Sequence, residues 1–277
     1  IRDSINEWAI RPVKMAAPEG TVVNCKFPAA VAARMQIGHF MTEMVFKALA
    51  KATPDNIIAE SGGTPAQTNI FYGKRSNGKP WLTMIIRGGG LGAGSRMDGH
   101  HCAIFPANGA NTPVEIFESD TPLIVEERSL VCDSGGAGKM RGGLGRKMII
   151  RVPDDNTAPQ GPTSIALQAG RFKYAPQGLF GAGPGAMARF LVNEQNGDPS
   201  GLTLCQAGDL IQFRSAGGGG YGDAYERDPD AVEQDVINGY VSIEKARKDY
   251  GVVVDPGTLK VDMKATRKAR AERKQSE

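Results

Sequence analysis

The stretch CDSGGAGKMRGGLGR, from Cys132 to Arg146, decides the fold of this chain, because its glycines crowd around a few charged side chains between two apolar, strand-like runs. Glycine loses more conformational freedom on folding than any other residue, so such a cluster needs a reason, such as a positive φ angle or a close approach of two backbones. We therefore expect this stretch to be where backbone and charge meet a ligand or a partner chain.

This stretch is not a phosphate-binding P-loop. A P-loop has a glycine five residues before its Gly-Lys pair, and a Ser or Thr after the lysine whose hydroxyl binds magnesium. Here Asp133 stands five residues before Gly138, and Met140 follows Lys139. A nucleotide loop is therefore excluded at this position.

Two further glycine clusters favour turns or close backbone contacts over a dinucleotide site. GGGLGAG, Gly88 to Gly94, formally matches the spaced glycines of the dinucleotide fingerprint, but the SRMDGHHC that follows has no helical period. GGGGYG, Gly217 to Gly222, matches the fingerprint loosely, and the residues after it do not begin an apolar-periodic helix at once. We predict no bound cofactor on this chain.

Composition indicates a soluble globular protein of the cytoplasm. The 277 residues are 40% hydrophobic and 23% charged, and the net charge of +3 is too small to argue for a nucleic acid or an anionic membrane as partner. No run approaches the roughly 18 apolar residues of a membrane span. The opening IRDSINEW lacks the apolar core of a secretory signal. The four cysteines form no CxxC pair, which favours reduced thiols over zinc ligands or disulfides.

The first part of the chain predicts an extended segment followed by one long helix. Residues 1–27 carry turn signals and short apolar pieces. From Pro28, apolar residues recur at spacings of three and four until Thr53-Pro54, which predicts an amphipathic helix of about five turns packed on a core. The apolar positions are Val31, Met35, Phe40, Met41, Met44, Val45, Ala48 and Leu49. We interpret His39 as an ordinary helix histidine and not as a metal ligand.

The middle of the chain predicts an antiparallel body. Asn77-Gly78 is the strongest short-range signal for a hairpin, here between strands at Asn69 to Gly73 and Lys79 to Ile86. Further strand-like pieces, with Gly, Pro and Asn between them, are Leu123 to Val131, Lys147 to Val152, Ser164 to Leu167, Ala188 to Asn193 and Asp209 to Arg214. Regular short strands of this kind are typical of a sandwich or barrel-like body.

The last part of the chain predicts helices. Asp228-Pro229 provides an N-cap and a first helical residue, with Asn238-Gly239 as the stop. Ser242 caps a second helix through Tyr250, which Gly251 ends. A basic tail follows from Asp262. The fold class is therefore α+β, divided into residues 1–60 (extended segment and helix), 61–225 (glycine-rich strand body) and 226–277 (helical segment packed on the body).

The segment DGHHCAIFPANGANTPVEIFE, Asp98 to Glu118, is the densest polar cluster. His100 and His101 would point to opposite faces of a strand, so at most one of them can join Asp98 at a metal. We therefore predict no metal site on this chain. Glu115 and Glu118 can orient a substrate or a basic partner, although ion pairs with the many arginines explain such acids equally well.

In this order, several stretches resemble the C-terminal half of the hydantoinase B/oxoprolinase family. They span nearly the whole chain: RPVKMAAPEGTVVN (Arg11 to Asn24), FPAAVAAR (Phe27 to Arg34), NTPVEIFE (Asn111 to Glu118), DSGGAGKMRGGLGR (Asp133 to Arg146) and GGGGYGDAYERDPDAVEQDVINGYVSIEKARKDYGVVVD (Gly217 to Asp255). Long ordered matches are far more specific than a single glycine fingerprint.

The resemblance implies a partner of the hydantoinase A type that uses ATP and Mg²⁺ to phosphorylate a small-molecule substrate, after which the B-type subunit completes the chemistry. In the hydrolase branch this opens a cyclic amide such as hydantoin, 5-oxoproline or a lactam. In the acetone and acetophenone carboxylase branch, an enol phosphate and carboxyphosphate combine. The resemblance places a divalent metal on the half that precedes the matched segments, so we expect that half on another chain of the complex, or this chain to be a fragment.

Three functions follow as hypotheses. The first is a component of an ATP-dependent cyclic amide hydrolase, the second is the alpha-type chain of a ketone carboxylase, and the third is a scaffold whose partner chains hold the reacting groups. If the chain contributes chemistry, the candidate catalytic residues are Asp98, Glu115, Asp133 and Arg141. The carboxylates would position a water or an amine, and the Arg141 guanidinium would hold a phosphorylated oxygen.

Overall fold

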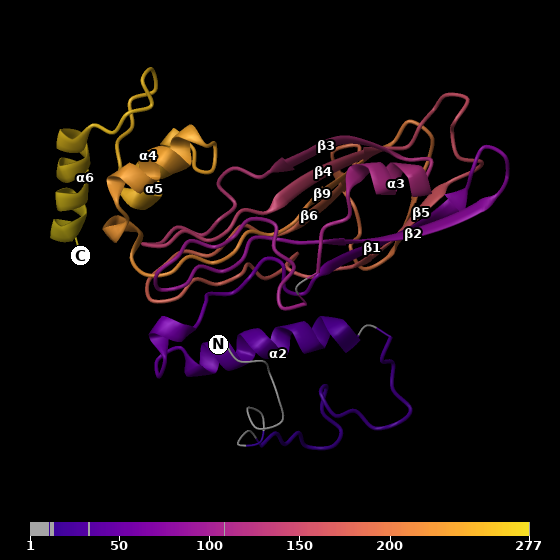
Figure 1. Ribbon diagram of the computed structural model, residues 1–277, viewed down its shortest axis with the longest axis horizontal. Helices are drawn as coiled ribbons and strands as arrows, with labels where there is room; N and C mark the ends of the chain where they lie inside the picture. Colours follow the sequence, from indigo (N-terminus) through magenta and orange to yellow (C-terminus); the bar gives the residue numbers. More distant parts are fainter. Residues whose placement is uncertain (1–10, 12–13, 33, 108, 277) are drawn as a thin grey trace.

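Two antiparallel sheets form the middle of the molecule (Figure 1). The computed structural model describes residue 11 and residues 14–32, 34–107 and 109–276. One sheet has the strand order β2-β1-β5-β8, and the other has the order β3-β4-β9-β6-β7. The strands are β1 Gln67–Lys74, β2 Pro80–Arg87, β3 Ile124–Leu130, β4 Arg146–Arg151, β5 Thr163–Gln168, β6 Arg189–Val192, β7 Gln195–Asn196, β8 Leu202–Cys205 and β9 Leu210–Arg214. The predicted antiparallel body is confirmed, and it is a sandwich and not a closed barrel.

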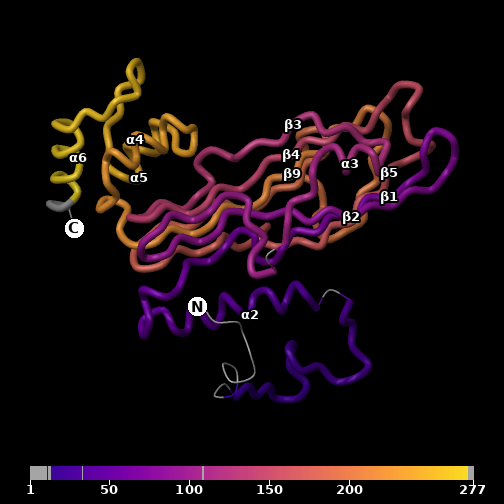
Figure 2. The backbone as a smooth tube through the Cα atoms, in the orientation of Figure 1, coloured from indigo at the N-terminus to yellow at the C-terminus, as the bar shows by residue number. Residues whose placement is uncertain are grey.

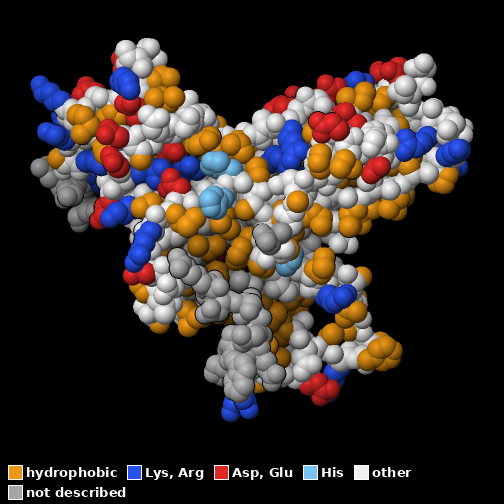
Figure 3. All heavy atoms as spheres, in the orientation of Figure 1, with side chains coloured by type: hydrophobic (Ala, Val, Ile, Leu, Met, Phe, Trp, Pro, Cys, Tyr) orange, Lys and Arg blue, Asp and Glu red, His pale blue; other side chains and the backbone are white. Residues whose placement is uncertain are grey.

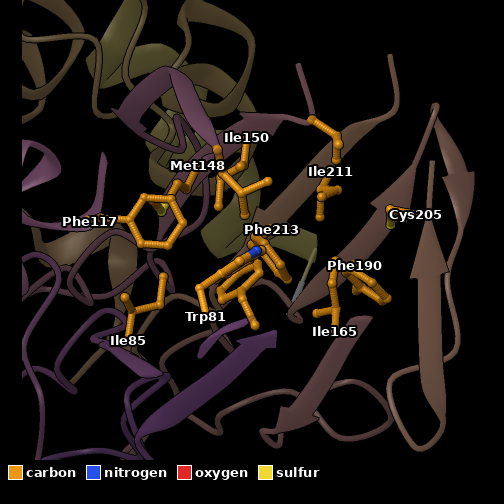
Figure 4. Close-up of a cluster of buried hydrophobic side chains, with 13 residues drawn as sticks. Trp81, Ile85, Phe117, Met148, Ile150, Ile165, Phe190, Cys205, Ile211 and Phe213 are labelled. Atoms are coloured by element: carbon orange, nitrogen blue, oxygen red, sulfur yellow. The ribbon is translucent and has the colours of Figure 1, made fainter. Parts of the chain in front are cut away.

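The sheets face each other across one hydrophobic core (Figure 4). Phe71 of β1 and Phe213 of β9 are fully buried, and their rings meet edge to face with centroids 5.9 Å apart. Phe117 lies in α3, Val114–Asp120, and its ring centroid is 5.5 Å from that of Phe71. Buried aromatic pairs of this geometry stabilise a core beyond the area that they bury. The core therefore fixes the two sheets relative to each other.

β1 and β2 form the predicted hairpin. Gly78 has a φ angle of +78°, and its N–H donates to the Arg75 carbonyl over 2.8 Å. The Arg75 N–H in turn donates to the Lys79 carbonyl over 2.8 Å. Pairing extends further than predicted, from Lys74 opposite Pro80 to Gln67 opposite Arg87. These extra residues place polar side chains inside one end of the sandwich.

Glycine-rich segments run side by side between the sandwich and the C-terminal helices (Figure 2). We call segments 59–63, 88–94, 134–145, 176–186 and 215–222 the glycine bundle. They hydrogen-bond backbone to backbone, for example from Gly218 N to Gly143 O over 2.9 Å and from Gly143 N to Leu91 O over 2.8 Å. A Cβ on Gly90 would lie 1.8 Å from Gly143 O. The predicted close approach of backbones is confirmed, and the approaching backbones belong to this chain.

The helix α2, Arg34–Leu49, lies beneath the glycine bundle in the view of Figure 1. It begins later than the predicted start at Pro28. Its apolar side is exposed, with Met44 at 67% and Val45 at 54% of full exposure, whereas the acidic Glu43 is buried. The prediction that the apolar face packs on a core is wrong, because periodicity identifies such a face but not what covers it. The predicted segment 1–27 falls partly on residues 1–10 and 12–13, which lie outside the described residues.

The C-terminal segment folds as its capping residues predict. The elements are η2 Ala224–Glu226, α4 Pro229–Ile237, α5 Ile243–Tyr250 and α6 Met263–Ser276, and a further short helix, η1 Pro54–Asn56, lies earlier in the chain. The Asp228 side chain accepts from Asp230 N, the Ser242 hydroxyl accepts from Lys245 N, and Gly251 has a φ angle of +63°. Tyr250 and Val232 belong to a separate small core. Figure 3 shows basic side chains at this end of the molecule. None of the described helices is long and apolar enough to cross a membrane.

Candidate functional site

A buried network of two arginines and two aspartates joins the glycine bundle to the C-terminal helices. We call Asp98, Arg141, Arg227 and Asp235 the junction network. Arg227 donates two hydrogen bonds of 2.7 Å to the Asp98 carboxylate and one of 2.8 Å to Asp235. Asp235 also lies 3.1 Å from Nε of Arg141. A protein interior tolerates charges that are paired and hydrogen-bonded, so these four side chains can remain buried. Their contacts link three segments that are distant in sequence.

The sequence-predicted residues Asp98 and Arg141 both belong to this network. The Arg141 N–H donates to the Asp98 carboxylate over 2.7 Å, and the Arg141 side chain donates to Gly142 O over 2.7 Å. Only 3% of Arg141 is exposed. Both side chains are therefore engaged with their own chain, and the guanidinium of Arg141 faces Asp235 and the Tyr240 ring, 5.2 Å away.

The network sets the protonation of its neighbours. Burial alone raises the pKa of Asp98, but the hydrogen bonds and charge of Arg227 and the Arg141 N–H outweigh burial, so the pKa lies below that of an ordinary aspartate. Burial, followed by the charge of Arg141, lowers the pKa of His101 to about 4. The neutral His101 accepts the Leu144 N–H at Nδ1 over 3.0 Å and packs against Tyr240, with ring centroids 4.6 Å apart.

Asp133 lies beside this network, and its hydrogen bonds connect the end of the glycine bundle to the start of α5. Its carboxylate accepts the Ser242 N–H over 2.8 Å, and its own N–H donates to Tyr240 O over 3.0 Å. Asp133 has a φ angle of +61°, which few residues other than Gly, Asn and Asp adopt. The structure thus brings Asp98, Asp133 and Arg141 into one region.

Glu115 lies elsewhere. It is an exposed residue in the first turn of α3, which covers the edge of the sandwich next to β2 and β3. Figure 1 shows α3 over the sheets and α4 and α5 at the other end of the molecule. The expected placement of His100 and His101 on a strand is also wrong, because residues 98–100 belong to no regular element and residues 101–102 form a turn.

A second buried ion-pair cluster, which the sequence did not predict, anchors α2. Arg171 donates to Glu43, to Glu60 over 2.9 Å and to Thr64 O over 2.9 Å. Burial raises the pKa of Glu43, and the charge of Arg171 opposes that rise. Arg171 is separated from Glu43 by more than a hundred residues, so no local spacing signals the pair.

A cavity lies between α2 and the outer side of the four-stranded sheet, with an empty volume of about 690 Å³ including its mouth. Its lining is mostly apolar, with a few polar groups, which is the usual character of a small-molecule site. His39 lines it, accepts the Ala66 N–H at Nδ1 over 3.2 Å and has a pKa lowered by burial. A neutral His39 carries its proton on Nε2 and can donate it to a carbonyl oxygen.

The described residues supply no group of three or more His, Cys, Asp and Glu side chains placed to hold a metal ion. The carboxylates of the junction network are taken up by arginines, which leaves them unsuited to bind a divalent cation. The two buried clusters hold segments that are distant in the sequence at fixed positions relative to one another.

Most of the chain matches proteins that are already known. A family model described as Hydantoinase B/oxoprolinase matches residues 2–224. The B-type subunit of a putative D-/L-hydantoinase from Pseudomonas sp. strain NS671 is 32% identical over 257 residues, which cover 90% of this chain and 42% of that protein. The crystal structure of an ATP-dependent caprolactamase from Pseudomonas jessenii matches at 28% identity and a TM-score of 0.78, covering 93% of this chain and 46% of that one.

A third likeness shows the fold alone. The nucleotide-free structure of an acetone carboxylase matches with a TM-score of 0.69 at 24% identity, over 82% of this chain and 35% of that one. In each of these proteins the matched part is less than half of the whole. The chain therefore spans about half the length, or less, of the relatives that it matches.

Proposed function

Because the chain belongs to the hydantoinase B/oxoprolinase family, we propose that it is a component of an ATP-dependent amidohydrolase complex that opens a cyclic amide such as hydantoin, 5-oxoproline or a lactam. The observation that carries the proposal is the likeness of nearly the whole chain to the ATP-dependent caprolactamase. An amide carbonyl is a poor electrophile until its oxygen becomes a leaving group, and phosphorylation supplies that activation.

The partner in this proposal is a hydantoinase A-type ATPase subunit that carries ATP and Mg²⁺. A second partner is the chain that carries the N-terminal half of the B-type subunit together with a divalent metal, since the described residues of this chain do not fit a metal. The exposed apolar side of α2 supports such an assembly. Met41, Met44 and Val45 are all between 43% and 67% exposed there, and exposed apolar patches mark interaction sites.

The cavity beside His39 supports a role in holding the small-molecule substrate. Its apolar walls suit the ring of a cyclic amide, and the Nε2–H of His39 is a donor for the carbonyl oxygen. In the assembled complex, His39→Phe is expected to raise KM for the amide at least tenfold, because a buried carbonyl would lose its partner. Unchanged KM would remove this cavity from the proposed site.

The decisive experiment purifies the chain with whatever co-purifies and measures ring-opened acid from hydantoin, 5-oxoproline and caprolactam. We expect product only with ATP, and co-purification of a larger ATPase subunit and a second chain. Phosphate release that depends on bicarbonate and a ketone would instead establish the ketone carboxylase. Turnover by this chain alone would contradict a purely structural role.

We propose a positioning role for Asp98 and Arg141 of the junction network and for Asp133 beside it, whereas Glu115 is a solvent-facing acid. Arg141→Lys should retain more ATP-coupled turnover than Arg141→Ala, since it keeps a positive charge beside Asp235. Loss of kcat with unchanged KM would indicate a role in the reaction itself. Glu115→Gln leaves the fold intact because the side chain is exposed, so unchanged turnover would exclude Glu115.

A further inference from the structure

One end of the sandwich interior is polar and carries arginines from both sheets. Gln67 and Asn69 of β1 share a face with the core residue Phe71, and Arg87 of β2 stands directly opposite Gln67. Side chains directly opposite on neighbouring strands share a face, so Arg87 points into the sandwich. On β4, Arg146 alternates with partly exposed residues and is buried as Met148 is, so it enters the same interior from the other sheet.

These arginines are buried without full hydrogen bonding. Arg87 is 2% exposed and Arg146 is 5% exposed. Among the described residues, nothing accepts from Nε or Nη1 of Arg87 or from Nε of Arg146, and Nη2 of Arg87 donates to Asn69 Oδ1 over 3.2 Å. The Asn69 Nδ2 group and both amide atoms of Gln67 also lack partners there. Orphaned donors in an interior are costly, and in native proteins a bound water or ion usually satisfies them.

The charge is also uncompensated. No ion pair within the described part of the chain involves Arg87, Arg146 or the third arginine of this region, Arg128. Burial and the charge of Arg146 lower the pKa of Arg87, while burial and the charge of Arg128 lower that of Arg146 to about 10. Both guanidinium groups are still charged at neutral pH. Burial raises the pKa of the neighbouring Cys102, so its thiol is neutral and provides no counter-charge.

The other buried arginines show what is missing here. Arg227 and Arg141 face two aspartates, and Arg171 faces two glutamates. Arg87 instead stacks on the Phe213 ring, 4.4 Å from its centroid, and faces another arginine. Each of these other three buried arginines therefore has a carboxylate partner within the chain. A carboxylate is the group that the region around Arg87 and Arg146 lacks.

A small, narrow cavity lies between these side chains, and about 10 Å³ of it is open to the centre of a water-sized sphere. Arg87, Arg128 and Arg146 all line it, together with apolar residues. Arg128 is exposed at the mouth, where it donates to Thr112 O over 3.0 Å. A guanidinium presents its donors in a planar fork that binds two oxygens of one oxyanion at once, which a spherical anion cannot offer, and the small cavity suits a carboxylate better than a larger phosphate.

We propose that this cavity binds one small planar oxyanion, a simple carboxylate or bicarbonate, between Arg87 and Arg146, with Arg128 at its mouth. The anion accepts hydrogen bonds from the N–H groups that lack partners, and its negative charge offsets the positive charges of Arg87 and Arg146. It therefore stabilises the end of the sandwich that adjoins the glycine bundle. This site stands independently of the amide-opening activity.

The test is thermal unfolding of the purified protein in increasing sodium acetate, formate or bicarbonate, with sodium chloride at equal ionic strength and pH as reference. A ligand that binds only the folded state raises Tm with its concentration. We expect a rise in Tm with the planar oxyanions beyond that in chloride. Equilibrium dialysis with labelled formate should give one bound anion per chain.

Arg146→Met and Arg87→Met should weaken oxyanion binding at least tenfold, because each removes a charged donor whose hydrogen bond is worth more than about 1.4 kcal/mol. Arg151→Met is the matched control, since Arg151 lies on the same strand but pairs with exposed Glu126. It should bind the anion as the wild type does. Equal Tm curves in acetate and chloride, or less than one anion per wild-type chain in dialysis, would overturn the site whether or not the variants fold.

Discussion

The β-sandwich and the glycine bundle are neighbouring regions that hold together in opposite ways. In the sandwich, side chains such as Phe71 and Phe213 interlock between sheets, and the backbones stay apart. In the glycine bundle, backbone lies on backbone, and a Cβ on Gly217 would fall 1.7 Å from Ser134 O. Volume-conserving changes are tolerated in the first kind of packing, whereas positions such as Gly217 in the second leave no room for a side chain.

The largest expected effect comes from Gly90→Ala in the glycine bundle. Its Cβ would meet Gly143 O at 1.8 Å and Gly218 N at 2.5 Å, and neither backbone can move without breaking its own hydrogen bonds. We expect loss of the folded protein, measured as insoluble expression or as absent cooperative unfolding by circular dichroism.

Gly38→Ala is the matched control for this substitution. Gly38 lies in α2 with nothing within 4 Å of an added Cβ, so alanine should stabilise the helix by up to about 1 kcal/mol. A cooperatively folded Gly90→Ala protein with wild-type Tm would show that the bundle can open, and the proposed contrast with the sandwich would be wrong.

In the sandwich, Phe71→Ala should leave a folded but weaker protein. Removing a fully buried aromatic side chain costs about 3–5 kcal/mol through lost burial and a residual cavity. The free energy of unfolding, from urea titration, is the measurement. Leu82→Ala on β2, where Leu82 is 71% exposed, should change it by less than about 0.5 kcal/mol. Equal losses at both positions would contradict the assignment of the core.

The next largest loss of stability is expected from a change in the junction network. Asp235→Asn removes the charge that faces both Arg141 and Arg227, and leaving buried arginines underpaired costs about 3 kcal/mol. The loss should appear as early release of the C-terminal helices, which faster hydrogen exchange in α4 and α5 would report. Glu226→Gln, in an exposed pair with Lys139, should leave exchange in these helices unchanged. Wild-type exchange in Asp235→Asn would refute the anchoring role.

Local signals in the sequence predicted much of the fold. Asn77-Gly78 indicated the first hairpin, and Asp228, Ser242 and Gly251 indicated helix ends, because each acts on backbone within a few residues. The glycines of Cys132 to Arg146 likewise indicated close backbone approach, since glycine is needed for its missing Cβ. Which segments approach could not be predicted, because Leu91 and Gly218 are far away in the chain.

The misplaced face of α2 and the missed partners in the candidate site have one physical cause, which is that partners distant in sequence leave no local pattern. The periodicity of α2 predicted an apolar face but not that Arg171, far along the chain, would pull Glu43 inward and leave Met44 outside. Polar residues set among glycines pointed to Asp98, Asp133 and Arg141, which lie in one region of the structure, and their catalytic role stays a prediction. Their partners Arg227 and Asp235 were not predicted, since they lie in an ordinary capped helix region.

The last expected effect is a pH dependence at His101, where the glycine bundle meets Tyr240. In the folded protein the pKa of His101 is about 4, against an ordinary value of 6.5, because burial, Arg141 and His100 disfavour the charged ring more than Asp98 favours it. A lowered pKa means that the unfolded chain binds the proton first, so this stabilisation is complete above pH 6.5 and is lost as pH falls towards 4. His101→Asn keeps an acceptor for the Leu144 N–H but cannot be protonated. Urea unfolding between pH 7 and pH 4 should therefore show a shallower loss of stability in His101→Asn than in the wild type, and parallel curves would mean that His101 is not held neutral at this contact.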